Sequence, residues 1–323
     1  MIILGIESTA HTFGIAILKN KKILCNLKKV FTTKKGGLIP NKVAEHHEKI
    51  KEKLLKQALE RSKLKVKDIE LIGISNAPGL APCLLVGLNF AKKLSKKLNV
   101  PLIGVNHCIA HLEIGRSLTN AKDPVLLYVS GANTQIIAYE GKKYRIFGET
   151  LDLGVGNFID TIARKLDLGF PGGPKIEELA KKSNKYIELP YNIKGMDFSL
   201  SGIQTNIISK IKIENIENLC YSLQETVFSM ITEVTERAMA HCNKKELLLG
   251  GGVACNKRLQ EMCLKMCKQR NAKFFILENQ YLTDNAAMIA LTAEKMYNLE
   301  GYKTKNIDIY PSQRTDQIEI TWH

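Results

Sequence analysis

The sequence lacks long hydrophobic runs and contains a single tryptophan among its 323 residues. A membrane-spanning helix needs about 20 consecutive apolar residues, and no stretch approaches that length. The opening residues, Met1–Glu7, include no basic leader and no small-residue cleavage site, so we expect no secretory signal. With 45% hydrophobic residues, the chain can still bury a sizeable core. These features favour a soluble, cytoplasmic protein without a membrane partner.

The sequence also lacks closely spaced cysteine pairs and has fewer acidic than basic residues. None of the eight cysteines forms a C-x-x-C pair, which argues against a disulfide framework or a thiolate zinc site. Asp and Glu number 32 against 47 Lys and Arg, for a net charge of +15. Such an excess indicates a polyanionic partner, with nucleic acid first. The alternative is a lysine-rich surface, because many lysines stand in scattered pairs such as Lys92-Lys93 and Lys181-Lys182.

The chain contains an internal repeat. Residues 4–21 and 126–143 are identical at seven positions when offset by 122. Both segments have the pattern of an apolar strand, a short Ser/Thr/Ala turn and a second strand. The repeat predicts an α/β protein of two related lobes. A polar stretch at Ala121–Pro124 marks the expected boundary, giving domains 1–121 and 122–323.

Each half continues in the same way. Strands are expected at Leu71–Ser75 and Glu246–Leu249, each followed by a turn rich in glycine or proline and then a helix. The helices are expected at Pro82–Leu98 and Asn256–Arg270. The hairpin turns of the two lobes, at 7–12 and 130–134, are rich in small and polar residues. They are either ordinary hairpins or a pair of turns closing on a phosphate from two sides, with the three glycines at 250–252 as a third loop.

A candidate metal site starts from two histidines. His107 and His111 are four residues apart, so on a helix both imidazoles would share one face. Tyr128 and Asp284, at a strand end and in a loop, are candidate oxygen ligands, and such a set suits Fe(II) or Zn(II). A metalloprotease would need glutamate directly after the first histidine. Cys108 occupies that position, so the protease interpretation fails.

Glycine-rich bends surround two further carboxylates. Asp160 and Glu177 are each expected in the first turn of a helix, where they would either complement the helix dipole or accept hydrogen bonds from ribose hydroxyls. Gly173 would allow a ligand to approach the backbone closely. Asn256 would either cap its helix or contact a nucleobase.

Taken together, the motifs resemble one family over essentially the whole chain, the tRNA N6-adenosine threonylcarbamoyltransferases, in the archaeal and eukaryotic branch of the KEOPS complex. The matching stretches are Gly5–Gly14, Asn106–His111, Tyr128–Gln135, Phe170–Glu177, Phe198–Gly202, Gly250–Asn256 and Thr283–Ala286. Bacterial relatives carry two consecutive aspartates where this chain has Ala10-His11, which places it on the archaeal side. Older descriptions of the family as glycoproteases disagree with the missing glutamate.

The resemblance implies a two-lobed actin-like ATPase fold, as in heat-shock ATPases and sugar kinases, with duplicated ribonuclease-H-like lobes and a nucleotide cleft between them. It implies transfer of threonylcarbamoyl from threonylcarbamoyl-adenylate to N6 of the adenosine at position 37, next to the anticodon, in tRNAs reading codons that begin with A. The implied ligands of one divalent metal, Fe(II) ahead of Zn(II), are His107, His111, Tyr128 and Asp284. The implied adenylate contacts are Tyr128, Ser130, Gly131, Asp160, Gly173, Glu177 and Asn256.

The resemblance also implies partners, namely tRNA and the other KEOPS subunits. One of these is a small protein kinase, which continues the same polypeptide in some archaeal relatives. No general base is assigned, although His11 in the first turn is a candidate. Two alternatives are an ATPase or small-molecule kinase on the same fold, and a non-catalytic scaffold.

Overall fold

The computed structural model describes residues 1–33, 39–298 and 307–322. Its strands are β1 Ile2–Glu7, β2 Thr12–Lys19, β3 Lys22–Val30, β4 Leu71–Ala77, β5 Leu102–Asn106, β6 Val125–Val129, β7 Thr134–Glu140, β8 Lys143–Glu149, β9 Ile193–Lys194, β10 Asp197–Phe198, β11 Glu246–Gly250 and β12 Lys273–Phe275. Its α-helices are α1 Pro40–Ser62, α2 Ala81–Leu98, α3 His107–Leu118, α4 Val155–Lys165, α5 Gly173–Ala180, α6 Ser201–Lys210, α7 Ile216–His241, α8 Lys257–Gln269, α9 Asn279–Leu282 and α10 Ala286–Tyr297. Within these residues no helix is both long and apolar enough to cross a bilayer.

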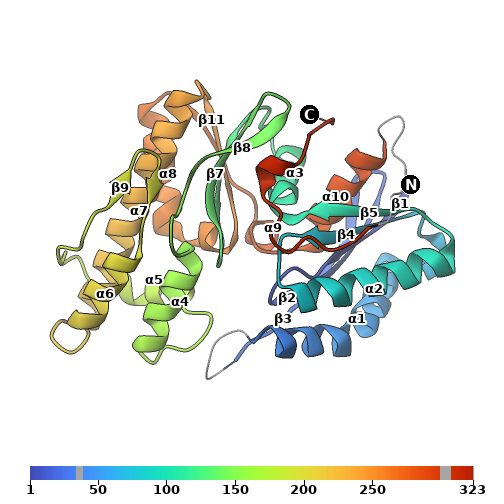
Figure 1. Ribbon diagram of the computed structural model, residues 1–323, viewed down its shortest axis with the longest axis horizontal. Helices are drawn as coiled ribbons and strands as arrows, with labels where there is room; N and C mark the ends of the chain where they lie inside the picture. The colour runs from blue at the N-terminus through green and yellow to red at the C-terminus, as the bar shows by residue number, and fades with distance from the viewer. Residues whose placement is uncertain (34–38, 299–306, 323) are drawn as a thin grey trace.

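Two five-stranded sheets of the same design organise the described residues. The first has the order β3-β2-β1-β4-β5, and the second, taken from its far edge, has the order β8-β7-β6-β11-β12. In each, three strands form an antiparallel meander and two further strands add in parallel. The first sheet lies on the right of Figure 1 and the second on the left. The predicted α/β architecture of two related lobes is therefore confirmed.

The cores follow from the alternation of side chains along the strands. In β1, Leu4 and Ile6 belong to the core that packs against α1 and α2, whereas Ile3 points to the opposite core with α10. Both faces of the first sheet are covered, so its inner strands β1 and β4 are apolar at most positions, whereas the edge strand β3 carries Lys22, Lys28 and Lys29. The second lobe buries one large core, formed largely by the sheet face toward α4 and α7.

Helix α10 carries the chain back to the first lobe. It packs against β1, β2 and β4, and small residues allow the close approach. A Cβ on Gly5 would lie 2.8 Å from that of Ala290, and one on Gly73 would lie 2.7 Å from that of Ala293. Residues after 285 thus return to the first sheet, although they fall within the predicted second domain. The division into domains 1–121 and 122–323 stays a prediction.

The final described segment, residues 307–322, joins the two lobes. On the first lobe, Tyr310 N donates to Asn76 O at 2.8 Å. On the second, Ile320 N donates to Lys142 O at 3.0 Å. Arg314 also pairs with Glu149 at 2.8 Å. This tail passes between the two lobes in Figure 1 (red ribbon ending at C).

Candidate active site in the cleft between the lobes

A cavity of about 1160 Å³ lies between the lobes. Its walls come from both hairpin turns, the β4–α2 turn, α4, the loop before α10 and the tail. Both predicted turns are present, at the β1–β2 and β6–β7 junctions, and both face this cavity. The duplicated strands thus place two similar turns on opposite sides of one cleft.

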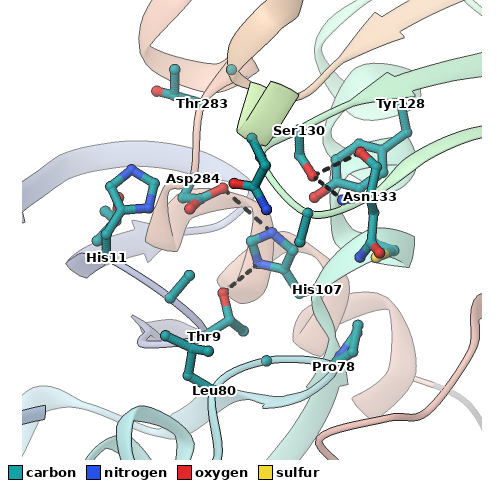
Figure 2. Close-up of a pocket in the computed structure, with 18 of the residues that line it drawn as sticks. Thr9, His11, Pro78, Leu80, His107, Tyr128, Ser130, Asn133, Thr283 and Asp284 are labelled. Carbon is teal, nitrogen blue, oxygen red and sulfur yellow. Dashed lines mark hydrogen bonds and ion pairs between the residues drawn. The ribbon is translucent and has the colours of Figure 1, made fainter. Parts of the chain in front are cut away.

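Three predicted metal ligands converge at the base of the cleft. His107 and His111 are on α3, as predicted, with ring centroids 4.8 Å apart. Asp284 Oδ1 lies 3.4 Å from His107 Nε2 and 3.6 Å from His111 Nε2. The three ligand atoms lie within 4.8 Å of one another. Figure 2 shows His107 and Asp284 pointing toward each other. Asn106 fixes the start of α3, because its side chain accepts from Cys108 N and Ile109 N.

A carboxylate outside this cluster orients His107. Glu7 Oε2 lies 2.9 Å from His107 Nδ1, and Glu7 Oε1 accepts from the amide and hydroxyl of Thr9. With Nδ1–H donating to Glu7, Nε2 is the nitrogen that faces Asp284. Metal-binding histidines commonly have such a carboxylate partner on the other ring nitrogen. Sequence analysis missed this role of Glu7, since its partner is 100 residues away.

The electrostatics of the cluster suit a cation. Burial alone would lower the pKa of His107, but Glu7 and Asp284 raise it well above the usual value. Burial lowers the pKa of His111, and within the described residues neither of its ring nitrogens has a hydrogen-bond partner. Two imidazole nitrogens and a carboxylate oxygen therefore face one point, where a bound cation would take the place of the proton that Glu7 and Asp284 favour on His107. This donor set fits a divalent metal such as Fe(II) or Zn(II).

Tyr128 lies beside the histidines. Its ring centroid is 5.0 Å from that of His111 and 6.5 Å from that of His107, and its side chain is 2% exposed. Burial raises the pKa of its phenol well above the usual value. The position agrees with the predicted ligand set, and metal binding by Tyr128 stays a prediction.

Glu113 takes no part in the cluster. It is fully buried, and its carboxylate bonds Lys295 Nζ at 2.5 Å, Arg116 Nη1 at 3.3 Å and the hydroxyl of Tyr144. Glu113 therefore belongs to this buried ion-pair network, and Cys108 stands where a metalloprotease would carry its glutamate.

The predicted adenylate residues divide into two groups. Tyr128, Ser130, Gly131 and Asp160 line the cavity, whereas Gly173, Glu177 and Asn256 do not belong to its lining. Asp160 Oδ1 accepts from Gly172 N at 2.7 Å, and burial raises the pKa of this carboxyl.

The second group lies around the start of α8. Glu177 Oε1 accepts from Lys257 N at 3.2 Å. Asn256 Oδ1 accepts from Arg258 N at 2.9 Å, which confirms the helix cap, and its Nδ2 donates to Gln224 at 2.6 Å. A Cβ on Gly173 would meet no atom within 4 Å, so the backbone there is open to approach.

The expected positions of the two carboxylates within their helices are wrong. Helix α4 begins at Val155 and α5 at Gly173, so Asp160 and Glu177 lie in the second turns, away from the dipole ends. Helix α4 starts early because of the second hairpin turn. The amides of Gly156 and Asn157 donate to the carbonyls of Ser130 and Gly131, at 3.0 and 2.9 Å.

Lys28, on β3, was also missed. Its ammonium bonds the hydroxyl of Thr283 and, at 3.1 Å, the backbone carbonyl of Asp284. Burial lowers the pKa of this lysine. It thereby fixes the loop that presents the Asp284 carboxylate, yet in sequence it resembles any other member of a lysine pair.

Comparisons with known proteins agree on one family. Residues 22–291 match the family model TsaD, described as tRNA N6-adenosine threonylcarbamoyltransferase. The chain is 50% identical to the protein of that name from Thermococcus sibiricus and 52% identical to that of Thermococcus kodakarensis, each over the full length of both proteins. It is 47% identical to a protein of Methanocaldococcus jannaschii titled "Probable bifunctional tRNA threonylcarbamoyladenosine biosynthesis protein", of which it covers 60%.

Solved structures show the same fold at low identity. HypF of Thermococcus kodakarensis superposes with a TM-score of 0.64 at 14% identity, over 91% of this chain and 47% of HypF. Component A of the (R)-2-hydroxyglutaryl-CoA dehydratase of Acidaminococcus fermentans gives 0.58 at 17% identity, over 91% of this chain and 98% of its own. The predicted actin-like fold is confirmed.

Proposed function

The chain belongs to the tRNA N6-adenosine threonylcarbamoyltransferase family, and we propose that it moves the threonylcarbamoyl group from threonylcarbamoyl-adenylate to N6 of adenosine 37 in tRNAs reading codons that begin with A. Its activity as a tRNA-modifying transferase rests on relatives at least 50% identical over the whole chain. The observation that carries the finer proposal is the convergence of His107, His111 and Asp284 in a cleft lined by both hairpin turns.

His107, His111 and Asp284, together with Tyr128, would hold one divalent metal, Fe(II) ahead of Zn(II). A metal bound there would polarise the carbonyl of the transferred group as a Lewis acid. Glu7 holds the tautomer of His107 in which Nε2 has a lone pair for the metal. Lys28 and Asn106 keep the two ligand-bearing segments in place.

The adenylate would lie along the second lobe. Ser130 and Gly131, in the second hairpin turn, would contact its phosphate, and Asp160 would contact the ribose. Glu177, Gly173 and Asn256 lie outside the lining of this cavity, around the start of α8. They would contact the nucleoside part of the adenylate. Because the donor is a mixed anhydride, AMP leaves without cleavage of ATP, and donors of the turn stabilise charge growing on its phosphate.

We further propose that the chain acts as the catalytic subunit of KEOPS, in the cytoplasm, with a small protein kinase among its partners. The Methanocaldococcus jannaschii relative, of which this chain spans 60%, is named a bifunctional protein, which supports a second activity acting alongside this one.

The test is reconstitution from purified components. The chain, with and without the KEOPS partners, is incubated with threonylcarbamoyl-adenylate and tRNA, and modified adenosine is measured by mass spectrometry. Modified adenosine without ATP is expected. ATP turnover in the absence of tRNA, with no modified adenosine under any condition, would instead favour an ATPase or kinase on the same fold.

A further inference from the structure

The cleft is somewhat larger than the pockets that usually hold one small ligand. Pockets for single drug-sized ligands measure about 300–1,000 Å³, and this one is about 1160 Å³. The residues proposed for the adenylate, Ser130, Gly131 and Asp160, account only for its second-lobe side. The reaction has two substrates, and the acceptor amine must come within about 3–3.5 Å of the carbamoyl carbon. A second part of the cavity must therefore reach the same point.

The remaining wall lies across the metal cluster from the adenylate residues. It includes the β4–α2 turn, Pro78–Leu80, and the tail segment Pro311–Gln313, which a backbone hydrogen bond joins. In Figure 2, Pro78 and Leu80 lie on the opposite side of His107 from Ser130. We propose that this part of the cavity, the acceptor arm, receives the adenine of the tRNA adenosine to be modified. The inference rests on the proposed function and adds where the second substrate binds.

Backbone contacts fix the acceptor arm before any ligand binds. Leu80 N donates to Thr9 O at 2.8 Å, and Gly79 N donates to Pro311 O at 3.1 Å. A Cβ on Gly79 would lie 3.0 Å from Thr9 Cα, so only glycine fits between the two segments. Three parts of the chain thus meet in one arrangement, which lowers the entropic cost of binding a base there.

The side chains of the arm suit a purine. Enzymes that modify a base extrude it and hold it between apolar or aromatic side chains with hydrogen bonds at its edge. Pro78, Leu80 and Pro311 supply apolar surface. Gln313 supplies an amide, held to the wall by Asn106 Nδ2 at 3.4 Å. An amide hydrogen bond to a ring nitrogen of adenine would leave the exocyclic amine free to react.

The location also suits the chemistry. The lone pair of the acceptor amine forms the new bond to the carbamoyl carbon, and the bond from that carbon to the adenylate oxygen breaks. AMP leaves with that electron pair, and one proton of the amine passes to solvent. A base in the acceptor arm reaches the carbon while AMP still occupies the second-lobe side.

The test uses a matched pair of variants. Leu80 is the N-cap residue of α2, and asparagine is a favoured residue at that position, so Leu80→Asn should fold. Leu85→Asn makes the same change on the same helix at a side chain that is 44% exposed and outside the cavity lining. Each protein is irradiated with tRNA carrying 8-azidoadenosine at the acceptor position, with AMP present in excess.

Crosslinked peptides are then mapped by mass spectrometry. We expect crosslinks at 78–80 or 311–313, a yield about tenfold lower in Leu80→Asn, on the scale of one lost base contact, and a wild-type yield in Leu85→Asn. AMP affinity and bound metal should match wild type in both variants. Crosslinks confined to other peptides, or equal yields in the two variants, would overturn the acceptor arm.

Failure of the arm can be told apart from failure of the proposed function. Transfer by the wild-type protein with crosslinks elsewhere contradicts the arm alone. Crosslinks in the arm without transfer under any condition support a base-binding site and contradict the transferase proposal.

Discussion

His111 is buried, yet within the described residues its ring nitrogens make no hydrogen bond. Its Nε2 lies 3.6 Å from Asp284 Oδ1, beyond an ordinary hydrogen bond. We predict that His111→Ala, purified without oxygen, contains far less metal than wild type and loses transfer in parallel. Metal is measured by inductively coupled plasma mass spectrometry. His241→Ala, which alters an exposed histidine of the second lobe, should keep its metal. Full occupancy in His111→Ala would refute the ligand assignment.

Asp160 offers a second test at a single side chain. It lines the cleft, and its Oδ1 accepts a hydrogen bond from Gly172 N, so Oδ2 is available to a ribose hydroxyl. Asp160→Ala should weaken AMP binding by about 1–3 kcal/mol, the scale of a hydrogen bond to a charged group. Calorimetric titration measures this. Glu177→Ala should also weaken binding, and the exposed neighbour Glu178 supplies a matched alanine control. If Asp160→Ala and Glu177→Ala both bind AMP as Glu178→Ala does, the ribose contacts are wrong.

At the scale of single residues, the sequence alone predicted some parts of the site and not others. The spacing of His107 and His111 predicted a shared helix face, because helical geometry is local. Glu7 and Lys28 were missed, because their roles depend on partners 100 and 256 residues away. A glutamate at a strand end and a lysine in a pair have no local pattern that distinguishes them.

At the scale of elements, α10 is the one that positions Asp284. The helix starts two residues after this ligand and packs on Gly5 of β1. Gly5→Ala would place a methyl group against the backbone of Ala286 and force the helix outward, at a cost of about 1–3 kcal/mol. We expect a lower midpoint in urea unfolding and less bound metal. Gly202→Ala, where the added Cβ meets nothing within 4 Å, should lose neither. If Gly5→Ala is less stable but binds as much metal as wild type, the packing of α10 does not position the metal ligands.

Helix α1 is attached to the first hairpin turn through His47. Its Nε2–H donates to Ala10 O at 2.8 Å, and burial lowers the pKa of this histidine to about 4. In the unfolded chain the pKa is about 6.5, so between these values the unfolded state binds more protons and stability falls as pH falls. We predict that His47→Gln, which keeps an amide donor and does not titrate, loses about 2 kcal/mol less than wild type between pH 7 and pH 5. Urea unfolding at both pH values measures the difference. Equal losses would mean that His47 is not held neutral.

Element boundaries were predicted well where the signals are local and less well where they are not. Helix α2 was expected from Pro82 and begins at Ala81, and α8 was expected from Asn256, which is its cap. Helix α4 was expected to have Asp160 in its first turn, but it begins at Val155. Its first amides donate to carbonyls of a hairpin turn about 25 residues earlier in the chain. No sequence pattern reports that contact.

For the whole molecule, we expect the net charge of +15 to make tRNA binding largely electrostatic. Each phosphate neutralised releases counterions, so affinity should fall by about one log unit per log unit of salt for every phosphate contact. We predict a steep fall from low to physiological salt, loose binding by the chain alone, and tighter binding and faster transfer with the KEOPS partners. Filter binding across a salt series, with and without partners, measures this. A flat salt series would refute the electrostatic account, and full turnover by the chain alone would refute the need for partners.

The metal cluster and its neighbours Glu7 and Tyr128 come from matching places in the two halves. His107 and His111 follow β5, and Asp284 follows β12, its counterpart in the second sheet. Glu7 ends β1, and Tyr128 lies near the end of β6, again its counterpart. A symmetric pair of identical half-chains would offer the same ligands from each half. The present set, with histidines from one half and a carboxylate from the other, therefore requires two halves that share a strand order but differ in sequence at these positions.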